Sequence, residues 1–126
     1  MIEPVLIAEH LQMIYSSPDS TLEALAEASF AVAPNEFVSI IGPSGCGKST
    51  LLRILGGLVQ PTGGRVIFRG QLLRQPQRSI GFVFQRANLM PWRSTLRNIM
   101  LPLEVEGVPK EEAEQRAKEM LNLVGL

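Results

Sequence analysis

The sequence predicts an α/β fold in which a glycine-rich loop joins a buried strand to a helix. Short apolar runs at 37–41 and 80–84 are typical of buried strands. Leucine and isoleucine side chains recur at helical spacing between residues 51 and 58. Residues 42–49, which connect the first run to this helix, are rich in glycine and end in Lys-Ser.

The chain is long enough for one domain with a modest core. It has 126 residues, 45% of them hydrophobic, with 12 basic and 12 acidic side chains. A disordered chain would be less apolar and more highly charged. The single cysteine excludes an internal disulfide and most metal-thiolate sites. We therefore expect a globular protein of the cytoplasm, with no apolar run long enough to span a membrane.

The N-terminal residues 1–35 are predicted to begin a small antiparallel sheet. Residues 5–8 and 28–32 have strand character, and the turn-rich segment 16–20 lies between them. Pro34-Asn35 then breaks the chain before the apolar run at 37–41.

The remaining elements follow the glycine-rich loop. Gly56-Gly57 ends the predicted helix, and residues 66–68 and 80–84 are expected to be strands. Beyond Gln85 the pattern becomes helical. Ser94 or Thr95 can cap a short helix that Pro102 breaks, and Pro109 can occupy the first position of another helix. That last helix has one apolar stripe, formed by Ala113, Ala117, Met120, Leu121 and Val124.

Charges are segregated along the chain. Residues 1–36 hold six acids and no lysine or arginine, residues 37–103 hold nine bases and no acid, and residues 104–126 hold six acids and three bases. A long acid-free stretch suits an anionic ligand, either a phosphate compound or nucleic acid. For any one arginine, a solvated surface position is the simpler interpretation.

Residues 42–49, Gly-Pro-Ser-Gly-Cys-Gly-Lys-Ser, fit the phosphate-binding pattern G-x-x-x-x-G-K-[ST] between a strand and a helix. Lys48 is expected to bridge the β- and γ-phosphates, Ser49 to ligate Mg²⁺, and Thr50 to donate to the α-phosphate. Cys46 occupies a variable position, where a small side chain is simply tolerated. The predicted phosphate contacts are Gly42, Pro43, Ser44, Gly45, Cys46, Gly47, Lys48, Ser49 and Thr50.

Three segments together resemble the ATP-binding subunit of ABC transporters, namely 41–52, 56–63 and Gly81-Phe82-Val83-Phe84-Gln85. The resemblance covers essentially the whole chain. It implies a P-loop NTPase fold of ABC type, with ATP and Mg²⁺ as ligands and ATP hydrolysis as the family activity. Residues 1–35 would start the antiparallel β-subdomain, 36–85 would run from the phosphate loop to the Q-loop, and 86–126 would start the helical subdomain.

The resemblance also implies roles for Tyr15 and Gln85. Tyr15 stands where the family has an aromatic residue that stacks on adenine, although a core or surface tyrosine is an alternative. Gln85 matches the Q-loop glutamine, which helps to hold Mg²⁺ or water and links the nucleotide to the transmembrane subunit. The alternative for Gln85 is an ordinary loop glutamine.

Residues 88–99 are similar to the ATPases of nitrate, sulfonate, taurine and bicarbonate importers, in which Leu-x-Pro-Trp follows the Q-loop. Here the pattern is Leu89-Met90-Pro91-Trp92. The resemblance implies a transmembrane permease docked on Gln85 to Ile99, with Trp92 as an apolar contact. It also implies a second ATP-binding subunit, a position on the inner face of the cell membrane and no nucleic-acid partner. Alternatively, Trp92 packs beneath its own domain.

Several family motifs do not occur in the sequence: an apolar strand ending in Asp-Glu, the Leu-Ser-Gly-Gly-Gln signature, a D-loop and a switch histidine. We therefore expect the N-terminal half of an ABC ATPase, ending within the helical subdomain, with no complete catalytic set. Two alternatives remain, an inert or regulatory nucleotide-binding fragment and a different P-loop NTPase such as a small-molecule kinase. A GTPase would need a guanine-reading aspartate after the loop, whereas Asp19 precedes it.

Overall fold

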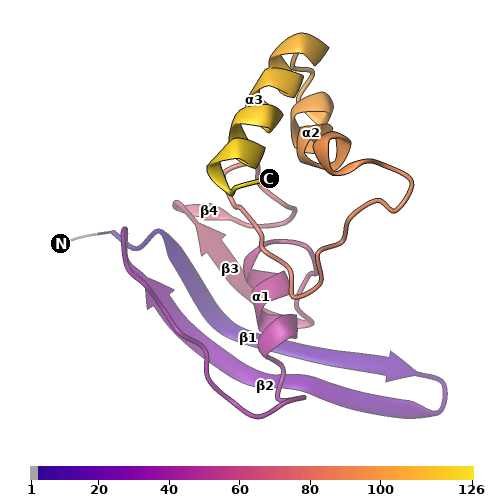
Figure 1. Ribbon diagram of the computed structural model, residues 1–126. Coiled ribbons are helices and arrows are strands. Elements are labelled where there is room, and N and C mark those ends of the chain that lie inside the picture. The colour runs from indigo at the N-terminus through magenta and orange to yellow at the C-terminus, as the bar shows by residue number, and fades with distance from the viewer. Residues whose placement is uncertain (1–2) are drawn as a thin grey trace. The chain divides into compact units, whose positions relative to one another are not determined.

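The computed structural model describes residues 3–126. These residues fall into two compact units that divide between Phe82 and Val83 (Figure 1). The first unit contains a sheet and one helix, and the second contains two helices. The predicted α/β class is confirmed.

The sheet of the first unit has the strand order β2-β1-β3-β4, and its neighbouring strands are antiparallel. The strands are β1 (Leu6–Ser17), β2 (Ser20–Val32), β3 (Gly63–Phe68) and β4 (Gln71–Leu72). The long β1–β2 hairpin turns at Pro18-Asp19, inside the segment predicted to turn (Figure 1). The antiparallel sheet is therefore confirmed, with β1 and β2 longer than their sequence patterns indicated and β4 not predicted.

Helix α1 (Lys48–Leu55) packs its apolar face on this sheet. Leu51 and Ile54 of α1 are buried with Leu11 and Met13 of β1 and with Val66 of β3. The helix ends as predicted, because the Gly57 N–H donates to Ile54 O and the Leu58 N–H donates to Arg53 O. The packing of Leu51 and Ile54 fixes the position of α1 on β1 and β3.

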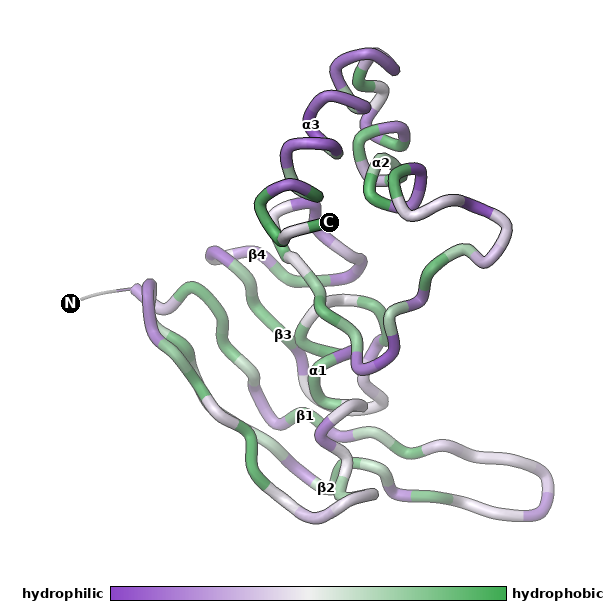
Figure 2. Tube along the Cα trace, in the orientation of Figure 1, coloured by the Kyte–Doolittle hydropathy of each residue, from purple (hydrophilic) through white to green (hydrophobic). Residues whose placement is uncertain are grey.

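The second unit pairs α2 (Thr95–Val105) with α3 (Lys110–Leu123). Its small core consists of Met100, Ala113 and Ala117, and the alanines allow the two helices to approach closely. Figure 2 shows that α2 is mostly hydrophobic and that α3 is mostly hydrophilic. Because Met120 and Val124 remain 52% and 69% exposed, only part of the predicted apolar stripe on α3 is buried.

Two predicted strands do not form. Residues 37–41 and 80–84 lie outside the helices and strands, and Phe37, Ile41 and Val83 are 91%, 93% and 99% exposed. A buried strand is stabilised by hydrogen-bonded neighbours and by cover on both faces. The sheet formed within residues 3–126 consists of β1 to β4 and includes neither segment.

Pro102 does not break its helix, contrary to the prediction. α2 continues through Pro102 to Val105, while Ser94 provides the predicted N-cap by accepting from the Arg97 N–H. Proline removes only one hydrogen bond, to the carbonyl of Asn98, and packing of Met100 and Leu103 against α3 outweighs that loss. Pro109 is the N-cap residue of α3 and not its first helical residue.

Within residues 3–126, no helix is long and apolar enough to cross a membrane.

Candidate functional site: a phosphate-binding loop

The predicted phosphate-binding loop runs directly into α1. Residues 44–47 form a turn and a bend, and α1 begins at Lys48. Gly45 and Gly47 both have positive φ angles, of 82° and 96°. Such angles are readily accessible to glycine and strained for other residues, so the loop geometry depends on both glycines.

The loop is packed against the sheet through Gly47. A Cβ atom on this residue would lie 2.2 Å from the carbonyl oxygen of Ala24 in β2. Ala24 is the extra residue of a bulge, because Met13 pairs with Leu25 whereas the next residue, Ile14, pairs with Glu23. The bulge therefore brings a β2 carbonyl against the start of α1, and Gly47 leaves the space for it.

The ammonium group of Lys48 is folded back onto the loop. Lys48 Nζ donates to Gly42 O at 2.7 Å and to Pro43 O at 2.6 Å, and it lies 3.5 Å from Cys46 Sγ. A cation is thus held at the centre of the loop beside the N-terminal end of a helix, and both features favour an anion there.

The neighbouring polar side chains differ in exposure. Ser49 is exposed in the first turn of α1, and Thr50 is half-buried. Ser44 and Cys46 are also exposed, so the outer side of the loop is open to a ligand. The donor set is one ammonium, several hydroxyls and a run of backbone N–H groups, which matches the acceptor oxygens of a polyphosphate.

Tyr15 lies in the same unit as the loop. Leu11 and Met13 of β1 are buried under α1, and side chains alternate along a strand, so Tyr15 belongs to the face that α1 covers. Tyr15 pairs with Leu22 of β2 and is 43% exposed. The ring is therefore partly exposed on the face of the sheet that α1 covers.

Gln85 lies in the second unit, in an exposed bend after the segment 80–84. The loop residues 42–50 and Tyr15 thus belong to one unit, and Gln85 belongs to the other.

The segment after Gln85 forms an ordered turn that exposes its tryptophan. Trp92 is 79% exposed, which overturns the alternative that it packs beneath its own domain. Trp92 lines a groove of about 620 Å³. Its other lining residues are apolar, basic and acidic, namely Leu96, Met100, Arg93, Arg97, Lys110, Glu104 and Glu114, together with Ser94.

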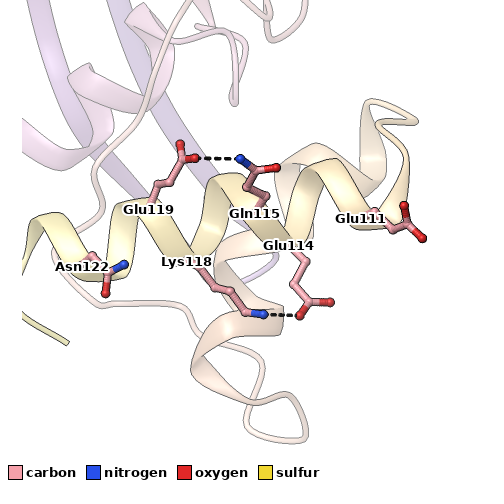
Figure 3. A pocket seen from close by; sticks show the side chains of 6 residues that line it. All are labelled: Glu111, Glu114, Gln115, Lys118, Glu119 and Asn122. Atoms are coloured by element: carbon pink, nitrogen blue, oxygen red, sulfur yellow. Dashed lines mark hydrogen bonds and ion pairs between the residues drawn. The ribbon is translucent and has the colours of Figure 1, made fainter.

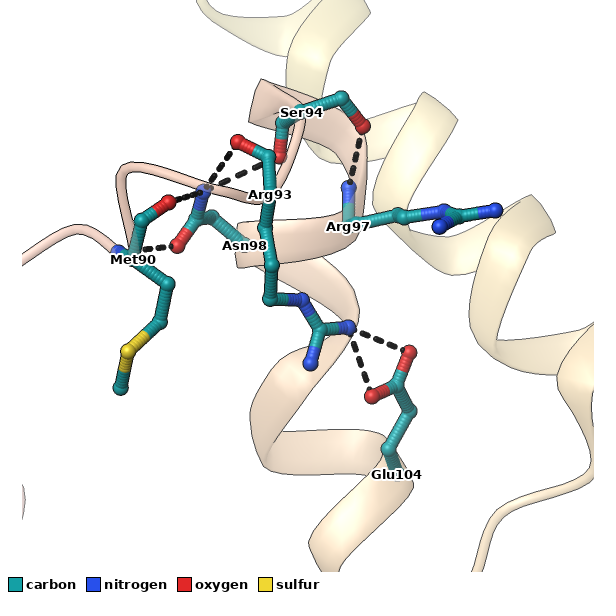
Figure 4. A network of polar contacts seen from close by, with 6 residues as sticks. All are labelled: Met90, Arg93, Ser94, Arg97, Asn98 and Glu104. Atoms are coloured by element: carbon teal, nitrogen blue, oxygen red, sulfur yellow. Dashed lines mark hydrogen bonds and ion pairs between the residues drawn. The ribbon is translucent and has the colours of Figure 1, made fainter.

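Polar contacts on α2 hold this turn, and the sequence patterns did not identify them (Figure 4). Asn98 binds the backbone of Met90, Arg93 and Ser94. Arg93 donates to both carboxylate oxygens of Glu104 at 2.7 Å. The available signal was an asparagine four residues after a predicted N-cap, where it can reach back to the preceding turn.

A second hollow, of about 420 Å³, lies along α3 and is lined by Glu111, Glu114, Gln115, Lys118, Glu119 and Asn122 (Figure 3). None of these six is a predicted nucleotide-binding residue. Lys118 donates to Glu114 and thereby lowers the pKa of that carboxyl. The excess of acids makes this surface unsuitable for a phosphate.

Comparison with known proteins places the chain in a family. Residues 25–126 match the family described as ABC transporter. An ABC transporter ATP-binding protein of Methanocaldococcus jannaschii is 43% identical over 96% of this chain and 45% of its own length. The methionine import ATP-binding protein MetN of Geobacillus kaustophilus is 40% identical over 97% of this chain and 38% of its own length. The taurine import ATP-binding protein TauB of Pseudomonas aeruginosa is 41% identical over 96% of this chain and 46% of its own length.

A solved structure is also similar, the dimeric post-hydrolysis state of the ATP-binding cassette MJ0796 bound to ADP and Pi. It has a TM-score of 0.82 and 34% sequence identity, over 96% of this chain and 57% of that one. The chain thus spans about half the length of the relatives it matches. With the family match over residues 25–126, these likenesses show that the chain belongs to the ABC transporter family, as an ATP-binding domain.

Proposed function

We propose that this chain binds Mg-ATP through residues 42–50 as part of the ATP-binding component of an ABC-type importer. The observation that carries the proposal is the position of Lys48, whose ammonium is held over a glycine loop at the start of α1. The solved cassette bound to ADP and Pi supports a nucleotide as the ligand.

Each loop group has a proposed role. The backbone N–H groups of 44–49 surround one phosphate, and Lys48 leaves the carbonyls of Gly42 and Pro43 to contact the β- and γ-phosphates. Tyr15 stacks on the adenine. Mg²⁺ would neutralise phosphate charge, held by the exposed Ser49 hydroxyl and by Gln85.

Equilibrium titration with Mg-ATP tests this binding. Each charge-assisted hydrogen bond contributes about 1.5–3 kcal/mol, so Lys48→Ala should weaken binding roughly tenfold to a hundredfold. The control is Lys110→Ala, an exposed lysine at the start of α3. Equal affinity of the wild type and Lys48→Ala would remove the loop from the proposed function.

The proposed partner is the cytoplasmic face of a transmembrane permease, docked on residues Gln85 to Ile99. Support comes from the exposed Trp92, from the groove that it lines together with apolar Leu96 and Met100, and from the import proteins among the relatives. This partner would hold the protein on the inner face of the cell membrane. The dimeric cassette supports a second ATP-binding subunit as a further partner.

Disulfide crosslinking tests the docking surface. A cysteine introduced at Leu89, next to the exposed turn, should crosslink to cytoplasmic loops of the permease in the full-length assembly. A cysteine at Asn122 on α3 serves as the control. Crosslinks from position 122 with none from position 89 would show that the permease docks on α3 and not on residues Gln85 to Ile99.

Our proposed assignment to an importer subgroup rests on one short motif. A methionine and a taurine import protein match at 40% and 41% identity, so overall likeness favours neither. The motif Leu89-Met90-Pro91-Trp92 supports our proposal of the nitrate, sulfonate, taurine and bicarbonate group.

A further inference from the structure

We propose that Asn98 is the positioning residue for Trp92: its side-chain amide holds the turn that presents the indole to a partner. The inference rests on the proposed docking of a permease on residues Gln85 to Ile99, and all of its contacts lie within the second unit (Figure 4).

The turn itself is short and stiff. The Arg93 N–H donates to Met90 O at 3.0 Å, which closes a four-residue turn. Pro91 takes the second position, where its fixed φ suits a turn, and Trp92 takes the third. The indole is therefore carried at the outer corner of a turn whose two ends are joined.

Asn98 joins this turn to α2 by every polar atom of its side chain. Its Oδ1 accepts from the Met90 N–H at 2.8 Å. Its Nδ2 shares two hydrogens among the carbonyls of Met90, Arg93 and Ser94, at 3.2, 3.1 and 3.0 Å. One amide thus contacts both ends of the turn and the N-cap residue.

A second connection acts on the same turn. Arg93 follows Trp92, and its guanidinium contacts both oxygens of Glu104, 11 residues along the chain and near the end of α2. The Arg93 side chain is only 19% exposed. Within residues 3–126 its Nε is buried without a hydrogen-bond partner, so the ion pair fixes the arginine through Nη2 alone.

These contacts exceed what the helix needs for its own cap. Ser94 already accepts from the Arg97 N–H as the N-cap of α2. Asn98 instead satisfies groups that precede the helix. The consequence is a turn with a fixed backbone and a large aromatic side chain left 79% exposed. Ordering before contact lowers the entropy that binding must remove, and a buried tryptophan is a frequent anchor of interfaces.

Trp92 is the single tryptophan of the chain, so its fluorescence reports on this turn alone. In Asn98→Ala the slowly decaying part of the time-resolved anisotropy should fall at least twofold, while Mg-ATP binding stays unchanged. Asn122→Ala, at an exposed asparagine of α3, should leave the anisotropy as in the wild type. Asn98→Asp keeps the size of the side chain and the acceptor for the Met90 N–H, but it sets a negative charge against three carbonyls. Its anisotropy should therefore lie between that of Asn98→Ala and that of the wild type.

Hydrogen exchange of the wild-type protein tests whether Asn98 holds the turn even if the variants unfold. The Met90 N–H should exchange at least tenfold more slowly than in an unstructured peptide, because Asn98 Oδ1 accepts its hydrogen. Exchange at the free-peptide rate, or unchanged anisotropy in a folded Asn98→Ala variant, would overturn the inference.

Crosslinking in the full-length assembly separates this inference from the proposed function. Asn98→Ala should lower the crosslinking rate of a cysteine at Leu89 by at least threefold. An unaltered rate would exclude Asn98 as a positioning residue for docking. If the wild-type turn is ordered but crosslinks only from α3, the docking proposal fails, and with it the assignment of Trp92 as a contact.

Discussion

The glycines of the phosphate loop differ in what surrounds them, and this difference is measurable. Gly45 and Gly47 share positive φ angles, but a Cβ on Gly45 meets nothing within 4 Å, whereas one on Gly47 meets the Ala24 carbonyl oxygen. Gly45→Ala should therefore cost about 1–2 kcal/mol of unfolding free energy from backbone strain. Gly47→Ala should cost a further ~1–3 kcal/mol from overpacking.

Urea unfolding of the two variants checks this difference. Because both substitutions add one methyl group to the same loop, Gly45→Ala is the matched control. Equal unfolding free energies would show that β2 yields to the added Cβ and that the contact with Ala24 is unimportant.

The carboxyl of Glu114 gives α3 a dependence on pH. Its hydrogen bond to Lys118 and the charge of that lysine lower its pKa in the folded protein, and Lys110 adds to the effect. A lowered pKa stabilises the folded state above the unfolded value, about 4.3 for glutamate, and the contribution is lost as pH falls through the folded pKa. Helix content should therefore decline as pH falls below about 4.

Acid titration followed by circular dichroism tests the role of Glu114. Glu114→Gln should flatten the decline, whereas Glu106→Gln, at a carboxylate with no ion pair within residues 3–126, should not. A decline of the same size in Glu114→Gln and in the wild type would assign the acid sensitivity to other groups.

At the scale of elements, Pro102 is a residue of low helix propensity inside a helix. It is exposed inside α2, where its ring contributes little packing and removes the hydrogen bond to Asn98 O. Proline is about 3 kcal/mol less favourable than alanine in a helix interior, partly offset by its stiffening of the unfolded chain. Pro102→Ala should raise the stability of the second unit by about 1–3 kcal/mol, measured by urea unfolding of the helical signal. A lower unfolding midpoint would mean that the proline bends α2 into a geometry that α3 requires.

Helices were more predictable than strands because a helix forms its hydrogen bonds within its own segment. The start of α1 at the phosphate loop, its end at Gly56-Gly57 and the Ser94 cap all follow from local chemistry. The apolar runs at 37–41 and 80–84 indicate only that these segments would be buried if they formed strands. They do not indicate whether a neighbouring strand is present to pair with them. The length of β1 and β2 was also hidden, since most of their residues near the hairpin turn are exposed.

The candidate site was also only partly predictable from the sequence. The loop residues 42–50 were predictable because spacing alone determines which backbone groups face a phosphate. The packing of Gly47 on Ala24 depends on a bulge that no local pattern signals. The role of Asn98 was hidden for a similar reason, because it depends on where the preceding turn lies.

For the whole molecule, the distribution of acids predicts weak catalysis. Residues 37–103 contain no carboxylate, so no acid from this stretch can orient the attacking water or help to hold Mg²⁺. We expect the purified 126-residue chain to release phosphate from ATP far more slowly than about 1 s⁻¹, a common enzyme turnover. A steady-state phosphate-release assay, with Lys48→Ala as background, measures this. Lys48-dependent turnover at or above that rate would show that the family mechanism assumed for this chain is wrong.

The central claim, that the phosphate loop holds the nucleotide, is tested most directly by backbone amide spectra recorded with and without Mg-ATP. The amides of Gly45, Gly47, Lys48 and Ser49 should shift the most and become protected from exchange, because they would donate to a bound phosphate. The shifts should be much smaller in Lys48→Ala at the same sub-saturating nucleotide concentration. Saturable shifts confined to α3 or to the β1–β2 turn, with the loop amides unmoved, would contradict the account.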